Sequence, residues 1–252
     1  MPDLLFLSGA GLLAGAMNAL AGGGTFITLP ALIAAGVPSV QANASSTVAL
    51  YPGGIASAWT YHDRLGAVGG VPVRRLLAMT LAGGLAGSVL LLETPGAAFD
   101  LILPWLLLVA TGALAFGRRL GAALSGRARA RPGLVAVVQF LLGVYGGYFG
   151  GAVGLMMVAF WCVLGESNIK ALNAPRTLLV SGANAIAVLV FVLAGAVRWP
   201  QTLVLLAGGV VGGVAGARLG RVLPAGLVRV LTLCCTGGMT VAFFVRAYLA
   251  AG

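Results

Sequence analysis

The chain has 252 residues, of which 60% are hydrophobic and only 8% are charged, and its formal net charge is +10. A soluble domain carries about 25% charged residues, so this composition excludes a soluble globular protein and predicts an all-α integral membrane protein. The basic excess does not indicate nucleic-acid binding, because the basic residues lie mostly between apolar segments, as the positive-inside rule expects.

The first half of the chain contains four apolar runs, and three consecutive glycines interrupt the first of them. Before the glycines, Leu4 to Ala21 has the length of a bilayer span, whereas Thr25 to Ala35 could cross only half of a bilayer. A polar link at 37–41 follows, and the next helix is predicted to begin at Asn43. The predicted runs are 4–35, 43–61, the run that follows Arg75 and ends at Leu92, and 101–116.

A strongly basic stretch with five arginines between 118 and 131 divides the chain and is predicted to be a cytoplasmic linker. The second half then repeats the pattern of the first. It has a run of spanning length, a half-length piece, a polar link, a helix that begins at Asn173 and two final runs. The predicted organisation is a first transmembrane repeat at 1–117, a linker at 118–132 and a second transmembrane repeat at 133–252.

Matching motifs support the two repeats. The segment 43–47 (Asn-Ala-Ser-Ser-Thr) recurs 130 positions later as 173–177 (Asn-Ala-Pro-Arg-Thr), and Gly24 matches Gly154 at the same offset. The glycine motif at 83–87 recurs at 212–216. Internal repeats with glycine-broken segments at matching positions are typical of transporters and indicate where the binding site lies.

The basic residues distinguish two topologies. If each broken run crosses once, the chain has eight spans, and ten of its fifteen basic residues lie inside and five outside. If the half-length pieces are re-entrant, the repeats are inverted, 13 basic residues lie inside, and only Arg198 and Arg246 lie outside. The second topology fits the positive-inside rule better. It would place Asn43 and Asn173 near the membrane midplane at helix N-termini.

A helix that begins at mid-membrane presents unpaired N–H groups and a positive dipole end, which together form an anion site. We expect the asparagines to cap these helices and the hydroxyls and glycine backbone to donate hydrogen bonds. Arg176 would add a permanent charge with a fork of donors that matches oxyanions. The predicted substrate-binding residues are Asn43, Ser45, Ser46, Thr47, Asn173, Arg176, Thr177, Gly23, Gly24 and Gly154.

Interpretations that involve no binding site also remain open for these residues. Arg176 could snorkel to the cytoplasmic face while the other polar residues only cap helices, and the glycines could be close-packing sites. Four further residues are candidate liners of the site, although core packing is the commoner role for such residues: Asn18, Tyr145, Tyr148 and Asn184.

The chain offers no arrangement of residues typical of catalysis or metal binding. Its five carboxylates lie in loops or at helix ends, its one histidine is next to Asp63, and its three cysteines have no metal-ligand spacing. We therefore expect no enzyme activity, no metal and no cofactor. A transporter of a small anion is predicted; the alternatives are a passive anion channel and a transporter of an unrelated anionic metabolite. The residues leave open whether the chain forms a homo-oligomer.

The motif Gly15-x-x-Asn18-x-x-Ala21-Gly22-Gly23-Gly24-Thr25, with Pro30, Pro38 and Asn43-Ala44, resembles the first motif of the TauE/SafE sulfite exporter family, related to toluene sulfonate uptake permeases. The stretches 143–150, 172–174 and 195–199 resemble its second half, so the resemblance covers nearly the whole chain. It departs from the family at 152–154, where a further glycine is common. The resemblance implies a multi-pass inner-membrane transporter for sulfite, sulfoacetate or another sulfur-containing anion. Transport direction and coupling ion stay open.

Overall fold

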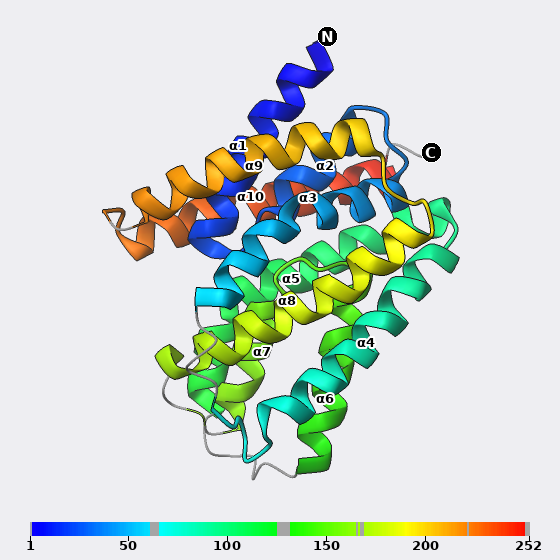
Figure 1. Cartoon of the computed structure of the whole chain (residues 1–252). Coiled ribbons are helices and arrows are strands. Elements are labelled where there is room, and N and C mark those ends of the chain that lie inside the picture. Colours follow the sequence, from blue (N-terminus) through cyan, green and yellow to red (C-terminus); the bar gives the residue numbers. More distant parts are fainter. Residues whose placement is uncertain are drawn as a thin grey trace.

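The computed structural model describes residues 2–60, 66–124, 132–164, 166, 169–220 and 222–249. Over these residues the chain forms ten α-helices and a final π-helical turn, and the only extended pairing is an isolated bridge between Val68 and Val71. Figure 1 shows the helices in one bundle, and their bounds are α1 (Pro2–Ala21), α2 (Thr25–Ala34), α3 (Ser39–Thr60), α4 (Val73–Glu93), α5 (Gly96–Leu124), α6 (Pro132–Tyr148), α7 (Val153–Val163), α8 (Ile169–Leu193), α9 (Trp199–Leu219), α10 (Ala225–Phe244) and η2 (Val245–Leu249).

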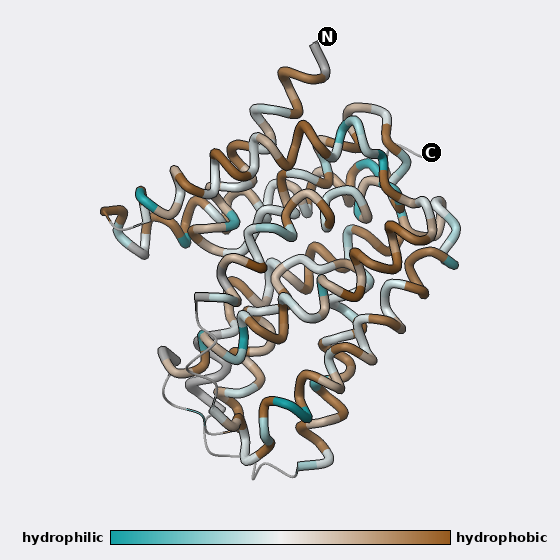
Figure 2. The backbone as a smooth tube through the Cα atoms, viewed as in Figure 1, coloured by the Kyte–Doolittle hydropathy of each residue, from teal (hydrophilic) through white to brown (hydrophobic). Residues whose placement is uncertain are grey.

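The predicted all-helical, multi-pass membrane protein is confirmed. Six described helices are long and apolar enough to cross a membrane, and they lie in α1, α4, α5, α8, α9 and α10. Hydrophobic residues occur along most of the bundle (Figure 2), and large ones such as Leu13 and Leu193 are exposed on its outside. Such a surface suits contact with lipid rather than water. The two expected half-length pieces form α2 and α7, with 10 and 11 residues.

Hydrogen bonds join helix ends at two opposite faces of the bundle. At what we call the first face, the Ser39 hydroxyl donates to Asp100 and the Arg198 Nε donates to Gln41 Oε1 over 2.6 Å. These bonds hold the starts of α3, α5 and α9 together, and the Tyr248 hydroxyl adds the end of η2 by donating to the backbone of α5.

At the second face, the backbone N–H of Gly69 donates to Glu166 Oε1 over 2.8 Å, which joins the α3–α4 link to the α7–α8 link. Arg229 Nη2 donates to the Ala115 carbonyl over 2.7 Å, near the start of α10 and late in α5. The long helices therefore run between these two faces. In the predicted linker at 118–132, residues 118–124 form the end of α5 and Pro132 begins α6, and residues 125–131 lie outside the described part of the chain.

Two helix pairs pack backbone against backbone, α1 with α9 and α4 with α6. A Cβ atom added at Gly212 would overlap the Leu12 carbonyl oxygen, and one added at Gly87 would overlap that of Val144. Only glycine permits such an approach. In both pairs the residue numbers of facing positions rise together, so the partners are parallel; Ser8 faces Gly208 and Ala16 faces Gly216.

Replacing one of these glycines therefore has a predictable cost. We expect Gly212→Ala to lower the free energy of unfolding by about 1–3 kcal/mol, the usual cost of overpacking. Gly112→Ala is the matched control, because Gly112 lies inside α5 with open space around its Cβ position. Thermal unfolding of both variants in detergent measures the difference. Equal stability of the two would contradict the close approach of α1 and α9.

The half-length helices begin level with the middle of their neighbours. A Cβ at Gly24, before α2, would lie 3.0 Å from Leu50, which is halfway along α3. A Cβ at Gly154, in the first turn of α7, would lie 3.1 Å from Val180 of α8. From these starts α2 runs back to the first face and α7 runs to the second face. The two short helices thus have their N-termini near the centre of the bundle.

The expected starts of α3 and α8 at Asn43 and Asn173 are wrong. The polar link folds as the first turn of α3, which begins at Ser39, because Pro38 offers its carbonyl to the Ala42 N–H over 2.8 Å. Helix α8 begins at Ile169, so Pro175 lies inside it rather than in its first turn. Each asparagine therefore lies one turn inside its helix and does not cap it. The helix N-termini near the centre of the bundle belong instead to α2 and α7.

Candidate functional site

The two glycine breaks, 22–24 and 149–152, meet at the centre of the bundle. Phe26 in the first turn of α2 contacts Phe149 edge to face, with ring centroids 6.4 Å apart. The Asn43 side chain crosses between the halves as well, because its Nδ2 donates to the Tyr148 carbonyl over 2.8 Å. Asn43 is 1% exposed. Side chains from both halves of the chain therefore fix the two breaks against each other.

The first backbone N–H groups of the short helices lie at this junction. In α2 the first turn begins with Phe26 N–H donating to the Gly23 carbonyl over 3.2 Å, and in α7 Leu155 N–H donates to the Ala152 carbonyl over 2.9 Å. The backbone N–H groups of Thr25 and Gly154 come just before these bonds. They belong to the leading N–H groups of a helix, which have no acceptor within that helix. Both helix dipoles direct their positive ends to the same region.

The turn before α7 uses left-handed backbone conformations. Gly150 has φ of 79° and Ala152 has φ of 58°. Glycine adopts such a conformation without steric cost, whereas the alanine Cβ is crowded there. Ala152 belongs to the stretch 152–154, where the family that the sequence resembles commonly has a further glycine. The turn nevertheless reverses the chain, so that α7 starts beside the middle of α8.

Buried hydroxyls hold the start of α2 against α3. The Ser46 and Thr28 hydroxyls are hydrogen-bonded to each other, and Thr28 Oγ1 also donates to the Gly24 carbonyl over 3.2 Å. Both side chains are fully buried. The sequence analysis identified Ser46 and Gly24 but missed Thr28. A polar residue inside an otherwise apolar half-length helix was the available signal.

This contact can be tested by a double-mutant cycle. Thr28→Val keeps the side-chain shape but leaves the buried Ser46 hydroxyl without its partner, at an expected cost of about 1–3 kcal/mol. Ser46→Ala removes the other hydroxyl, and the double variant should lose clearly less stability than the two single losses summed. Unfolding of all four proteins in detergent gives the coupling energy. Additive losses would mean that the two hydroxyls do not interact.

Arg176 lies at the start of α7. A Cβ added at Gly154 would lie 3.3 Å from Arg176 Cδ, so the absence of a side chain at Gly154 leaves room for the arginine stem. Arg176 itself is only partly buried. The structure therefore brings Arg176 of α8 together with Gly154 of α7, and it links Ser46 of α3 to Gly24, the residue before α2, through the Thr28 hydroxyl.

The other predicted residues have contacts elsewhere. The Thr47 and Thr177 hydroxyls donate within their own helices, to the carbonyls of Asn43 over 3.0 Å and of Asn173 over 2.8 Å. Ser45 Oγ accepts the Arg198 backbone N–H over 2.9 Å, near the first face. Gly23 is packed beside α1, where an added Cβ would lie 2.9 Å from the Met17 side chain. Their roles in the structure are thus in packing and helix connection.

The candidate liners divide into two kinds. The tyrosines bond outward, Tyr145 to the Leu106 carbonyl over 3.1 Å and Tyr148 to Thr94 over 3.3 Å. Among the described residues, four buried side-chain atoms have no hydrogen-bond partner, including the Oδ1 atoms of Asn43 and Asn184. A Cβ at Gly150 would lie 3.7 Å from Asn184 Oδ1. Near the helix breaks, the amide oxygens of these two asparagines, rather than the tyrosine hydroxyls, are therefore left to accept a hydrogen bond.

Comparison with known proteins gives consistent results. A family model described as "Sulfite exporter TauE/SafE" matches residues 7–243. The chain is 32% identical over 234 residues to a probable membrane transporter protein ORF9 of a Sinorhizobium species, covering 90% of this chain and 87% of the relative. It is 31% identical over 210 residues to the probable membrane transporter protein YfcA of Escherichia coli, covering 82% and 77%. A probable membrane transporter protein of Haemophilus influenzae is 28% identical, covering 94% of each chain. No solved structure matches the chain.

Proposed function

Because the chain belongs to the sulfite exporter TauE/SafE family, we propose that this membrane transporter carries a small anion bound between the N-termini of α2 and α7. The proposed anion is a sulfur oxyanion or organosulfonate of the sulfite type. The relatives' names specify a membrane transporter without a substrate. The observation that carries the proposal is the start of α7 at the centre of the bundle beside Arg176.

The residues at the helix breaks would stabilise an anion in three ways. The N–H groups at Thr25 and Gly154 would donate hydrogen bonds, the helix dipoles would add positive potential, and Arg176 would supply a permanent charge. A buried anion without such partners is strongly disfavoured. Ser46 and Thr28 would hold the start of α2 in place through their mutual hydrogen bond, and Asn43 would hold the two breaks together.

We also propose that the two repeats are inverted in the membrane. Helix α1 runs parallel to α9, which begins at the first face, whereas α6 runs parallel to α4, which begins at the second face. Arg198 and Arg246 lie at or near the first face, whereas a larger set lies at or near the second, namely Arg74 and Arg75 at the start of α4, Arg218 at the end of α9, and Arg229. By the positive-inside rule, the second face would be cytoplasmic in an inner-membrane protein.

Cysteine labelling tests this orientation. In a variant with Cys162, Cys234 and Cys235 replaced by alanine, single cysteines are placed at the exposed positions Leu4 and Gly133, at the starts of α1 and α6. We expect a membrane-impermeant maleimide added to intact cells to label Leu4→Cys, and to label Gly133→Cys only after permeabilisation. Gly96→Cys and Gly226→Cys are controls for the two faces. Labelling of Leu4→Cys and Gly133→Cys from one side would exclude inversion.

Anion binding to Arg176 variants tests the site itself. We expect wild-type protein in detergent to bind sulfite, with sulfate, thiosulfate, taurine and chloride as comparison ligands in calorimetry. Arg176→Ala should bind about 10- to 100-fold more weakly, because a hydrogen bond to a charged group contributes about 1.5–3 kcal/mol. Arg176→Lys keeps the charge without the fork and should fall between. Arg218→Ala is the control, because Arg218 is exposed in the last turn of α9.

The outcomes separate the possibilities. Equal binding by wild type and a folded Arg176→Ala variant would place the site elsewhere and make Arg176 a snorkelling residue. Absence of binding for every anion would refute the sulfur-oxyanion substrate and leave only the membrane-transporter family. If the anion binds, uptake into proteoliposomes discriminates mechanisms: a saturable flux with exchange of internal substrate supports a transporter, whereas a non-saturating current supports a passive channel.

A further inference from the structure

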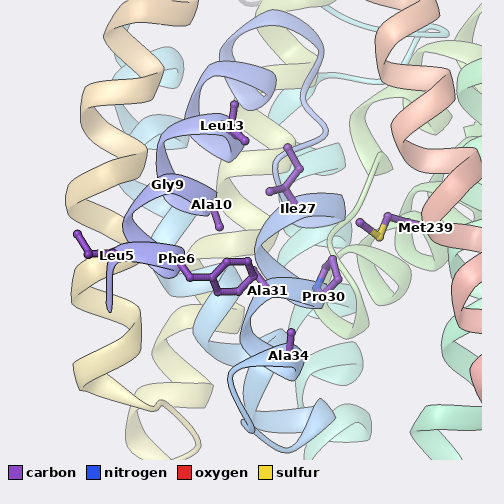
Figure 3. Close-up of a pocket in the computed structure, with 10 residues that line it drawn as sticks. All are labelled: Leu5, Phe6, Gly9, Ala10, Leu13, Ile27, Pro30, Ala31, Ala34 and Met239. Atoms are coloured by element: carbon purple, nitrogen blue, oxygen red, sulfur yellow. The ribbon is translucent and has the colours of Figure 1, made fainter. Parts of the chain in front are cut away.

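An apolar groove lies on the outside of the bundle, between α1, α2 and α10. Its volume is about 570 Å³, and it contains none of the residues predicted for the anion site. In Figure 3, Phe6 and Ala10 of α1 and Ile27 of α2 line one side, and Met239 approaches from α10 on the other. The lining carries no charge, and its members are Leu5, Phe6, Gly9, Ala10, Leu13, Ile27, Pro30, Ala31, Ala34 and Met239.

A second hollow of about 320 Å³ continues the groove toward the end of α10. It shares Pro30, Ala34 and Met239 with the first and adds Phe243 and Arg246. The Arg246 guanidinium carbon lies 6.0 Å from the centre of the Phe243 ring, a distance at which a cation and an aromatic face attract each other. The apolar groove therefore ends beside an exposed arginine that an aromatic ring helps to position.

The length of the groove along α1 is close to the thickness of one membrane leaflet. It begins near Leu5 and Ala34, at the end of the bundle that includes the first face, and reaches Leu13 and Ile27, close to the central start of α2. At a rise of about 1.5 Å per residue, Leu5 and Leu13, which are eight positions apart, are separated by about 12 Å along α1. Half of a hydrocarbon core of about 30 Å is about 15 Å. Arg246 thus lies at the end of the groove that would meet the lipid headgroups, and the apolar lining would extend from there to mid-membrane.

We propose that the groove binds one phospholipid, with an acyl chain along α2 and the phosphate on Arg246. Hydrocarbon matches the uncharged lining, and the planar fork of arginine matches phosphate oxygens. The groove would otherwise leave the outer side of the short helix α2 uncovered, because α2 spans only half the thickness that α1 and α10 span. A bound acyl chain fills this space. This inference does not depend on which anion is transported, or on whether any is.

Lipid retention and lipid-dependent stability test the proposal. The purified full-length chain is delipidated in detergent and titrated with phosphatidylglycerol, and bound lipid is counted by native mass spectrometry while thermal unfolding is followed in parallel. We expect one lipid per chain and a raised melting temperature. Arg246→Gln should weaken binding about tenfold through the lost phosphate contact. Gly9→Leu should abolish it, because the Gly9 position has open space in the groove that leucine would occupy.

Matched controls distinguish this site from general lipid contact. Arg218→Gln removes an exposed arginine near the end of α9, and Gly226→Leu adds a leucine at an open position outside the groove. Both should bind as wild type does. Ala34→Leu is a second groove-filling variant if Gly9→Leu fails to fold. Diacylglycerol and inorganic phosphate, each offering one half of the ligand, should bind far more weakly than phosphatidylglycerol.

Three results would overturn the proposal. One is equal lipid retention by all variants, and another is an equal loss in the control variants; either would indicate unspecific annular lipid. The third is a detergent-stable dimer that Gly9→Leu disrupts, which would assign the groove to a second copy of the chain. Because lipid binding is measured without substrate, failure of this inference leaves the anion-binding test unaffected, and the reverse also holds.

Discussion

The structure depends on one constraint, that backbone polar groups inside a bilayer need partners. A helix that starts at mid-membrane violates this constraint at its first turn, since its leading N–H groups have no intrahelical acceptor. In the proposed orientation, α2 and α7 both start in this way near the centre of the bundle, α2 against α1 and α3, and α7 against α8. Partners for these groups must therefore come from neighbouring segments or from a ligand, and a ligand that accepts hydrogen bonds is an anion or a polar molecule.

Glycines make this enclosure possible, and they do so in three different ways. At Gly87 and Gly212 they let parallel helices touch backbone to backbone, which draws the two halves of the chain together. At Gly22 and Gly150 they take left-handed conformations that end α1 and reverse the chain before α7. At Gly154 the missing side chain gives space to the stem of Arg176. The composition alone could not distinguish these three roles, because it counts every glycine alike whichever role the residue has.

Segment lengths and hydropathy were enough to predict the membrane class and the two half-length helices, whereas the roles of Arg176 and Gly154 in anion binding stay predictions. The start of α3 was misplaced because its first turn is polar and follows Pro38, a pattern equally typical of a surface link. Ser39 in that turn is buried instead and bonds to Asp100, and further along α3 Ser46 bonds to Thr28, a partner 18 positions earlier. The pairing of α1 with α9 also escaped prediction, since periodicity within a helix shows which face is apolar but not which distant helix covers it.

The two halves differ in charge where they meet. Ser46 occupies in the first half the position that Arg176 occupies in the second, so one helix start has a neutral hydroxyl pair beside it and the other has an arginine stem. The serine is fully buried and already bonded to Thr28, whereas the arginine is partly exposed. Hydroxyls that satisfy each other fix the position of α2 but attract an anion weakly, while a guanidinium attracts one from a distance. In the proposed site, the charge of the substrate would therefore lie nearer α7, and α2 would contribute mainly its oriented N–H groups.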